Sequence, residues 1–233
     1  MKTNLVKSMA ARANVAPAVP AIAFPRLATT ESQALKRAMD VVLGSLFLVL
    51  SFPLLLLAAL AIRLESGGPV LFAHTRVGHG GRRFRLWKFR TMRTDGDAVL
   101  ERHFEELPEA RAEWESTHKL RHDPRVTRVG RWLRRTSIDE LPQLWNVLRG
   151  EMSLAGPRPV VEAEKTHYGA AWPLYTLAVP GLTGLWQVSG RNDTSYRRRV
   201  ALDAYYVRNW SLRLDIEVLL RTVRVVLLGK GAY

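Results

Sequence analysis

Two adjacent carboxylates, Asp139 and Glu140, lie in the most chemically loaded stretch of the chain, Arg134 to Gln143. An ionised aspartate can attack phosphorus, and a neighbouring carboxylate can bind Mg²⁺. Arg134, five residues before Asp139, carries a planar guanidinium that suits phosphate. A structural interpretation is equally open, because Ser137-x-x-Glu140 matches a helix capping box and acids are favoured in a first helical turn. The stretch is therefore consistent with phosphate chemistry or with an ordinary helix start.

Three further segments contain the cations, glycines and prolines that phosphate sites use. They are Lys88–Arg90, Gly156–Pro159 and Pro180–Arg191. Each is weak evidence when read singly, because a solvated basic face is the alternative for Lys88 and for Arg134. A plain loop is the alternative for the group formed by Pro157, Arg158 and Pro159. Only the combination of segments points to a phosphate-binding site.

An apolar run from Val41 to Ile62 contains no charge between Asp40 and Arg63. It has about the twenty residues that a bilayer-spanning helix needs, so the sequence predicts membrane contact. Pro53 lies within the run and predicts a kink or reversal near Ser51 and Pro53. Basic residues dominate both flanks, which favours a re-entrant helix over a straight span.

The composition is strongly basic, with 35 Lys and Arg against 21 Asp and Glu, a net charge of +14, and no cysteine. Residues 63–233 hold 29 of the basic and 19 of the acidic side chains, so most of the excess lies outside the apolar run. Such a charge predicts anionic partners, namely lipid headgroups, phosphates or nucleic acid. The lack of cysteine excludes disulfides and thiolate metal sites.

The elements expected around these segments define an α+β chain that is mostly helical. Residues 1–30 are a flexible tail, 31–66 a proline-broken re-entrant membrane helix, and 67–233 a cytosolic catalytic domain at the membrane surface. Two β-like runs flanking Gly78–Gly81 predict a small hairpin, and a pair of charged helices meets at Pro108. Residues 212–228 predict an amphipathic helix that is either interfacial or packed on a core.

Taken in order behind Lys36-Arg37-x-x-Asp40, these motifs resemble the bacterial sugar transferase family, the monotopic polyprenyl-phosphate phosphoglycosyl transferases. The resemblance covers residues 36–233. Leu182–Arg191 is similar to the hexose-1-phosphate branch, and the whole chain to the short galactosyl-phosphate transferases of exopolysaccharide synthesis. One departure is that relatives place serine directly before the membrane proline, whereas Phe52 precedes Pro53 here and the serine is Ser51.

The resemblance implies that a hexose-1-phosphate, galactose or glucose, moves from a UDP-sugar to undecaprenyl phosphate with release of UMP. This would be the first membrane step of exopolysaccharide or O-antigen synthesis, at the cytoplasmic face of the bacterial inner membrane. It makes Asp139 the nucleophile of a covalent phospho-sugar intermediate and Glu140 an Mg²⁺ ligand. Asp203 matches a further acidic position that would share the metal, with an exposed helical acid as its alternative.

The remaining roles implied by the resemblance concern binding. Lys88 and Arg134 would contact phosphates, and Arg158, stiffened by Pro157 and Pro159, the uridine end. Membrane lipid is an expected partner, and a homodimer is left open. Two other functions compete, a non-catalytic basic membrane scaffold and a nucleic-acid-binding membrane protein with stacking tryptophans. The second is disfavoured because no nucleic-acid module is visible and the apolar run has no role in it.

Overall fold

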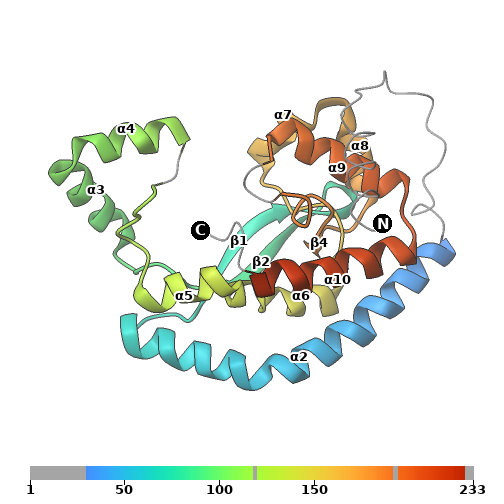
Figure 1. Ribbon diagram of the computed structural model, residues 1–233, viewed down its shortest axis with the longest axis horizontal. Coiled ribbons are helices and arrows are strands. Elements are labelled where there is room, and N and C mark those ends of the chain that lie inside the picture. Colours follow the sequence, from blue (N-terminus) through green and yellow to red (C-terminus); the bar gives the residue numbers. More distant parts are fainter. Residues whose placement is uncertain (1–29, 118–119, 191–193, 229–233) are drawn as a thin grey trace. The chain divides into compact units, whose positions relative to one another are not determined.

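The computed structural model describes residues 30–117, 120–190 and 194–228 (Figure 1). The predicted tail therefore lies almost wholly outside the described residues, as does Arg191. The described chain forms two compact units. The first comprises residues 30–50, 73–87 and 142–228, and the second comprises 51–72 and 88–141. The site segments are accordingly divided between the two units.

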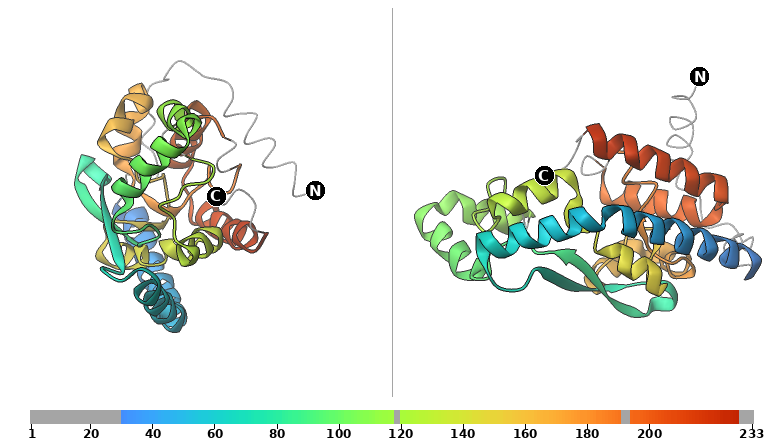
Figure 2. Two further views of the ribbon diagram at one scale, coloured as in Figure 1. Left: turned by 90° about the vertical axis from the view of Figure 1, so that its left-hand side faces the viewer. Right: turned by 90° about the horizontal axis from the view of Figure 1, so that it is seen from below.

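Helix α2 (Thr30–Ser66) contains the apolar run and is one continuous ribbon in Figures 1 and 2. Within the described residues it is the one helix long and apolar enough to cross a membrane. Large apolar side chains along it are exposed, including Val49, Leu50 and Leu57 at 65–70%. Pro53 lies inside the helix, so the break predicted at Ser51 and Pro53 is not confirmed. An exposed apolar surface of this length is expected for a segment that contacts lipid.

The predicted hairpin is confirmed by strands β1 (Leu71–Val77) and β2 (Arg83–Phe89), which pair in a two-stranded sheet. Their connection contains Gly80 and Gly81, both with positive φ, a conformation that glycine adopts without steric cost. Beyond β2 the second unit continues into α3 (Gly96–Glu106) and α4 (Pro108–Thr117), the predicted charged pair, which lie side by side in Figure 2. Pro108 opens α4, where proline costs no hydrogen bond.

Helix α5 (Arg128–Thr136) completes the second unit and packs on the C-terminal half of α2. Leu133 of α5 is fully buried against Ala58 and Ile62 of α2 and Phe89 of β2. Ile138, one residue before Asp139, borders the same cluster. The apolar helix thus supports the backbone that carries the two candidate catalytic carboxylates.

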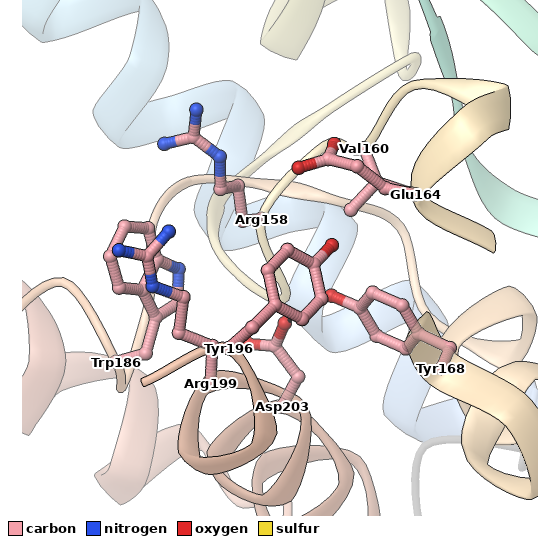
Figure 3. A pocket seen from close by; sticks show the side chains of 8 residues that line it. All are labelled: Arg158, Val160, Glu164, Tyr168, Trp186, Tyr196, Arg199 and Asp203. Atoms are coloured by element: carbon pink, nitrogen blue, oxygen red, sulfur yellow. Dashed lines mark hydrogen bonds between the residues drawn. The ribbon is translucent and has the colours of Figure 1, made fainter. Parts of the chain in front are cut away.

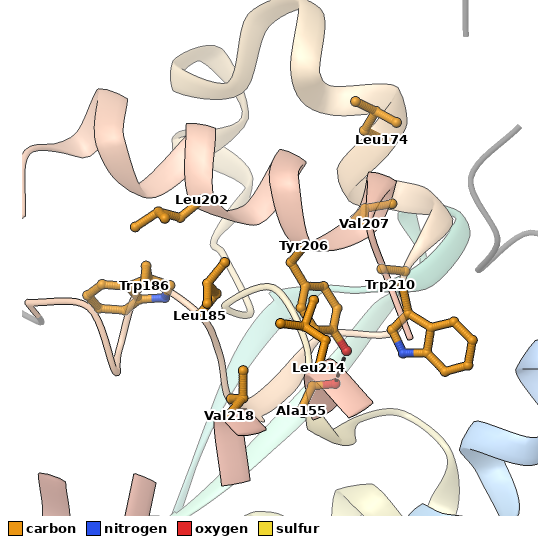
Figure 4. Close-up of a cluster of buried hydrophobic side chains, with 11 residues drawn as sticks. Ala155, Leu174, Leu185, Trp186, Leu202, Tyr206, Val207, Trp210, Leu214 and Val218 are labelled. Atoms are coloured by element: carbon orange, nitrogen blue, oxygen red, sulfur yellow. Dashed lines mark hydrogen bonds between the residues drawn. The ribbon is translucent and has the colours of Figure 1, made fainter. Parts of the chain in front are cut away.

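The first unit is built around a parallel pair of three-residue strands, β3 (Ser153–Ala155) and β4 (Gly181–Thr183). The short helices α6 (Gln143–Arg149), α7 (Lys165–Tyr168) and α8 (Trp172–Leu177) surround it with the longer α9 (Tyr196–Arg208) and α10 (Leu212–Leu228). The core includes Trp186, Tyr206 and Trp210 and is drawn in Figure 4.

Helix α10 combines the two interpretations left open by its sequence. Leu214 and Val218 are buried in the core of the first unit, so one face packs on protein. Ile216, Leu220 and Val223, at helical spacing, are 46–68% exposed, so a second apolar stripe faces outward. That stripe is suited to the headgroup layer of a membrane.

The two basic residues before the apolar run are used inside the first unit. The Lys36 Nζ lies 2.7 Å from Asp215 Oδ2 and also donates to the Ala155 carbonyl and the Tyr206 hydroxyl. Arg37 donates to two carbonyl oxygens at the end of α6. These charges fix the start of α2 to the first unit.

Candidate active site

The candidate catalytic turn is held at the end of α5. At the N-terminus of α5, Thr127 Oγ1 accepts a hydrogen bond from Gly130 N at 2.8 Å. The carboxylate of Glu65, at the end of α2, accepts from the backbone N–H groups of Arg128 and Val129. It ends at Ser137, whose φ of 59° is the left-handed conformation that stops a helix. The next three residues, Ile138–Glu140, form a 3₁₀ turn. The capping-box interpretation is wrong, because the Ser137 side chain forms no cap hydrogen bond there.

Asp139 lies on this turn and is 8% exposed. Burial, followed by the charge of the adjacent Glu140, raises its pKa to about 6, while Lys88 and Arg134 oppose the rise. At this pKa the Asp139 carboxylate predominates at pH 7.5, and because it is buried it is poorly solvated. Such a carboxylate is a stronger nucleophile than a hydrated one.

Glu140 is paired with Lys88, whose Nζ lies 2.5 Å from its Oε1. The side chains of Lys88 and Glu140 are 31% and 38% exposed, so the carboxylate remains accessible to an incoming ion. Magnesium uses one or two protein carboxylates together with substrate phosphates. The described residues contain no group of three or more acidic, histidine or cysteine side chains that could hold a metal alone. The adjacent carboxylates therefore fit Mg²⁺ only as a site completed by a phosphorylated substrate.

Arg134 occupies the last turn of α5 and is oriented by a hydrogen bond from its Nε to Thr91 Oγ1, 2.9 Å long. Desolvation lowers its pKa, and the nearby Asp139 carboxylate partly restores it. The structure thus places Lys88, Arg134, Asp139 and Glu140 in one electrostatically coupled group within the second unit. The alternative of a solvated basic face does not describe Arg134.

A pocket in the first unit contains two more of the predicted residues, Arg158 and Asp203 (Figure 3). Asp203 is 2% exposed and accepts a 2.7 Å hydrogen bond from the Tyr168 hydroxyl. Burial raises its pKa to about 7, and that hydrogen bond is the largest opposing effect. Asp203 is therefore not an exposed helical acid. Its sharing of a metal with Glu140 stays a prediction.

The loop before this pocket is positioned by the parallel strand pair. Gly181 N donates to the Pro157 carbonyl and Gly156 N to the Thr183 carbonyl, so two predicted motifs are hydrogen-bonded to each other. A Cβ on Gly181 would lie 2.2 Å from Gly156 N, which explains the glycine. The Arg158 guanidinium lies 5.4 Å from the Trp186 ring centroid, and the Pro159 carbonyl faces Arg76.

Several residues that line the pocket were not predicted from the sequence, among them Tyr168, Tyr196 and Arg199, and Trp186 was included only as part of Pro180–Arg191. Tyr196, Arg199 and Asp203 follow one another at spacings of three and four on α9, which places them on one helix face. That spacing was a usable signal. Arg199 also approaches Trp186, at 4.6 Å, so the indole has contacts with two guanidinium groups.

The chain is 52% identical over 198 residues to the exopolysaccharide production protein ExoY of Rhizobium meliloti, covering 85% of this chain and 88% of that one. It is 50% identical over 207 residues to the UDP-galactose-lipid carrier transferase of Erwinia amylovora, covering 89% of this chain but 43% of the relative. The UDP-glucose:undecaprenyl-phosphate glucose-1-phosphate transferase of Caulobacter vibrioides is 49% identical over 208 residues, 85% of this chain and 72% of that protein.

The length of the match differs between these relatives. The chain spans less than half of the Erwinia protein but most of ExoY. The family model for bacterial sugar transferases matches residues 31–229, which include α2 and both units. The chain therefore belongs to the bacterial sugar transferase family.

Proposed function

We propose that the protein transfers a hexose-1-phosphate, of galactose or glucose, from a UDP-sugar to undecaprenyl phosphate and releases UMP. The observation that carries this proposal is the buried Asp139 carboxylate beside Glu140, with Lys88 and Arg134 as its nearby cations. The names of two relatives specify UDP-galactose with a lipid carrier and UDP-glucose with undecaprenyl phosphate. A phosphoryl acceptor and a sugar-nucleotide donor match the chemistry of this site.

In the first step, an Asp139 oxygen forms a bond to the phosphorus that carries the sugar, and the bond from that phosphorus to the UMP oxygen breaks. Arg134 and Lys88 offset the repulsion between the carboxylate and the diphosphate. In the second step, an oxygen of the lipid phosphate attacks the same phosphorus and releases Asp139. Bound Mg²⁺, held by Glu140 and the diphosphate, would neutralise charge on the phosphate oxygens. Asp203 is retained as a proposed further ligand.

Arg158 is proposed to bind the nucleotide end of the donor. Its guanidinium is held against Trp186, in a pocket that also presents two tyrosine rings and a buried carboxyl group. Planar cations and aromatic rings suit a nucleoside. Pro157 and Pro159 restrict the backbone on both sides of Arg158, so little conformational entropy is lost on binding.

We further propose that α2 enters and leaves the membrane on the same, cytoplasmic, face. Its first turns are bonded within the first unit, through Lys36 and Arg37, and its last turn is bonded within the second unit, through Glu65. A single crossing would separate these sets of bonds by a bilayer. Between residues 66 and 228 the described chain passes repeatedly from one unit to the other without another helix of membrane length. Re-entry at one face satisfies both sets of bonds.

The test is UMP release by purified protein in detergent, with a panel of UDP-sugars, with and without undecaprenyl phosphate and with Mg²⁺ or EDTA. We expect sustained release that needs a UDP-hexose, the lipid phosphate and Mg²⁺, and no release by Asp139→Asn. Asp97→Asn, which changes an exposed acid of the same unit, is the matched control and should retain activity. Silence across the panel would refute the proposal. Full activity of the Asp139 variant would support a different catalytic residue.

A further inference from the structure

Two arginines converge on the turn that follows α2. Arg63 is the first charged residue after the apolar run, and its Nη1 donates to the Gly68 carbonyl at 2.8 Å. Arg90, just after β2, donates from Nη2 to Ser66 Oγ at 2.8 Å and to the Gly67 carbonyl. Neither interaction involves an acid. The turn Ser66–Gly68 thus gathers two positive charges where α2 leaves its apolar run.

The Arg90 guanidinium is buried without a counter-ion. The residue is 8% exposed, and its Nε and Nη1 are buried with no hydrogen-bond partner. In the part of the chain that the structure describes, no carboxylate lies within ion-pair distance of Arg90 or Arg63. Desolvation lowers the pKa of Arg90, and the charge of Arg63 lowers it further. Buried cations are normally paired and fully hydrogen-bonded, so this arrangement is incomplete.

The end of α2 accounts for part of the arrangement. The last carbonyls of a helix carry about half a negative charge, and cations near them are stabilising. The carbonyls that accept from Arg90 Nη2 and Arg63 Nη1, however, are those of Gly67 and Gly68, in the turn just after the helix. Two donor nitrogens of Arg90 and more than one unit of positive charge are left over. An anion with several acceptor oxygens would satisfy both.

The surroundings favour an anion that carries an apolar tail. Leu60 and Leu64, on the last turns of α2, are 55% and 77% exposed and lie beside the cationic turn in sequence. Gly68 has a φ of +63°, and a Cβ there would lie 2.8 Å from Arg90 Nη1. Any larger residue would therefore crowd the guanidinium. Cations next to exposed leucines suit a ligand that has a phosphate headgroup on a hydrocarbon chain.

We propose that Arg90, assisted by Arg63, binds the phosphate monoester of the lipid acceptor. This inference rests on the proposed function and adds the acceptor site to it. A phospholipid headgroup offers the same oxygen chemistry, but a monoester carries up to two negative charges, which matches two cations. Arg90 follows Lys88 by two residues, so their Cα atoms are at most about 7 Å apart. Lys88 is the partner of Glu140, so the phosphate is held near the catalytic turn.

The experiment measures binding, without any UDP-sugar, of farnesyl phosphate to the detergent-solubilised protein by ³¹P NMR titration. Inorganic phosphate and phosphatidylglycerol are titrated in parallel. We expect farnesyl phosphate to bind at least threefold more tightly than either. Its affinity should fall tenfold or more in Arg90→Gln and less in Arg90→Lys, which keeps the charge. Arg102→Gln, an exposed arginine of the same unit, should bind like the wild type.

Equal affinity of Arg90→Gln and wild type would overturn the site, and equal binding of phosphatidylglycerol would overturn the monoester as its occupant. If circular dichroism shows that Arg90→Gln is misfolded, Arg90→Lys decides: threefold weaker binding supports the site and unchanged binding refutes it. Single-turnover UMP release without acceptor separates the two proposals. If wild-type protein binds farnesyl phosphate but releases no UMP, the proposed function is refuted and the anion site is retained. The control Arg102→Gln should release UMP within twofold of wild type.

Discussion

Replacing Asp139 by asparagine should stabilise the metal-free protein while abolishing its activity. Burial and the neighbouring Glu140 raise the pKa of Asp139 from 3.8 to about 6. A pKa raised in the folded state means that the native protein binds the proton more tightly than the unfolded chain does. The charged form therefore costs stability above pH 6, and the cost disappears as the pH falls towards 3.8. At about 1.4 kcal/mol per tenfold change in proton affinity, the penalty at pH 8 is about 3 kcal/mol.

Asparagine has the shape of the protonated acid and no charge, so Asp139→Asn removes this penalty. For a chain of this size, about 3 kcal/mol corresponds to a rise in melting temperature of roughly 6–12 °C. The assay is thermal unfolding of both proteins in the same detergent with EDTA, between pH 4.5 and pH 8. The gain should be largest at pH 8 and about a third as large at pH 4.5. A variant no more stable than wild type at pH 8, or a gain independent of pH, would refute the claim that Asp139 is desolvated.

The remaining predictions concern single contacts. Lys88→Met should raise the pKa of Asp139, because the charge of Lys88 lowers that pKa in the wild type. The pH–rate profile of the variant should therefore show activity beginning at a higher pH. An unchanged profile would exclude this coupling. Tyr168→Phe removes the donor to buried Asp203 and should lower the free energy of unfolding by about 1–3 kcal/mol in urea titrations at pH 8. Lys36→Met leaves the fully buried Asp215 without its counter-ion and should lower the free energy of unfolding by about 3–5 kcal/mol. The double variant Lys36→Met/Asp215→Leu should recover most of that loss.

The elements with strong local signals were predictable from the sequence. The hairpin around Gly78–Gly81, the helices that meet at Pro108 and helix α10 were confirmed close to their expected bounds. Each depends on periodicity, glycine or proline, which act over a few residues. The parallel strands β3 and β4 were not predicted. Their three-residue lengths show no alternation, and they pair across 25 residues of intervening chain.

The candidate site was predictable as a set of residues but not in its physical state. The chain order of the motifs identified Asp139, Glu140, Lys88 and Arg134. No local pattern indicated that Ser137 would adopt the left-handed conformation, or that a 3₁₀ turn would take the place of the expected helix start. Local pattern alone cannot show whether a polar side chain is buried.

Burial of charge was the main feature that sequence patterns could not predict. Lys36 enters the sequence analysis only as a basic residue flanking the apolar run, yet it is buried and its partner Asp215 lies 179 residues further along the chain. Asp203 was left as either a metal ligand or a surface acid, and it is buried beneath Tyr168. Both outcomes depend on long-range packing, which no local window of sequence contains.

The central claim is that Asp139 forms a covalent bond to the phospho-sugar. The most direct measurement is mass spectrometry of the intact protein and of its peptides after incubation with a UDP-hexose and Mg²⁺, without lipid acceptor, and an acid quench. We expect a mass increase of one hexose phosphate on the peptide that contains Asp139, its loss when undecaprenyl phosphate is added, and its absence in Asp139→Asn. Sustained transfer to lipid with no adduct on rapid quenching, or an adduct that survives in the Asp139 variant, would contradict the account.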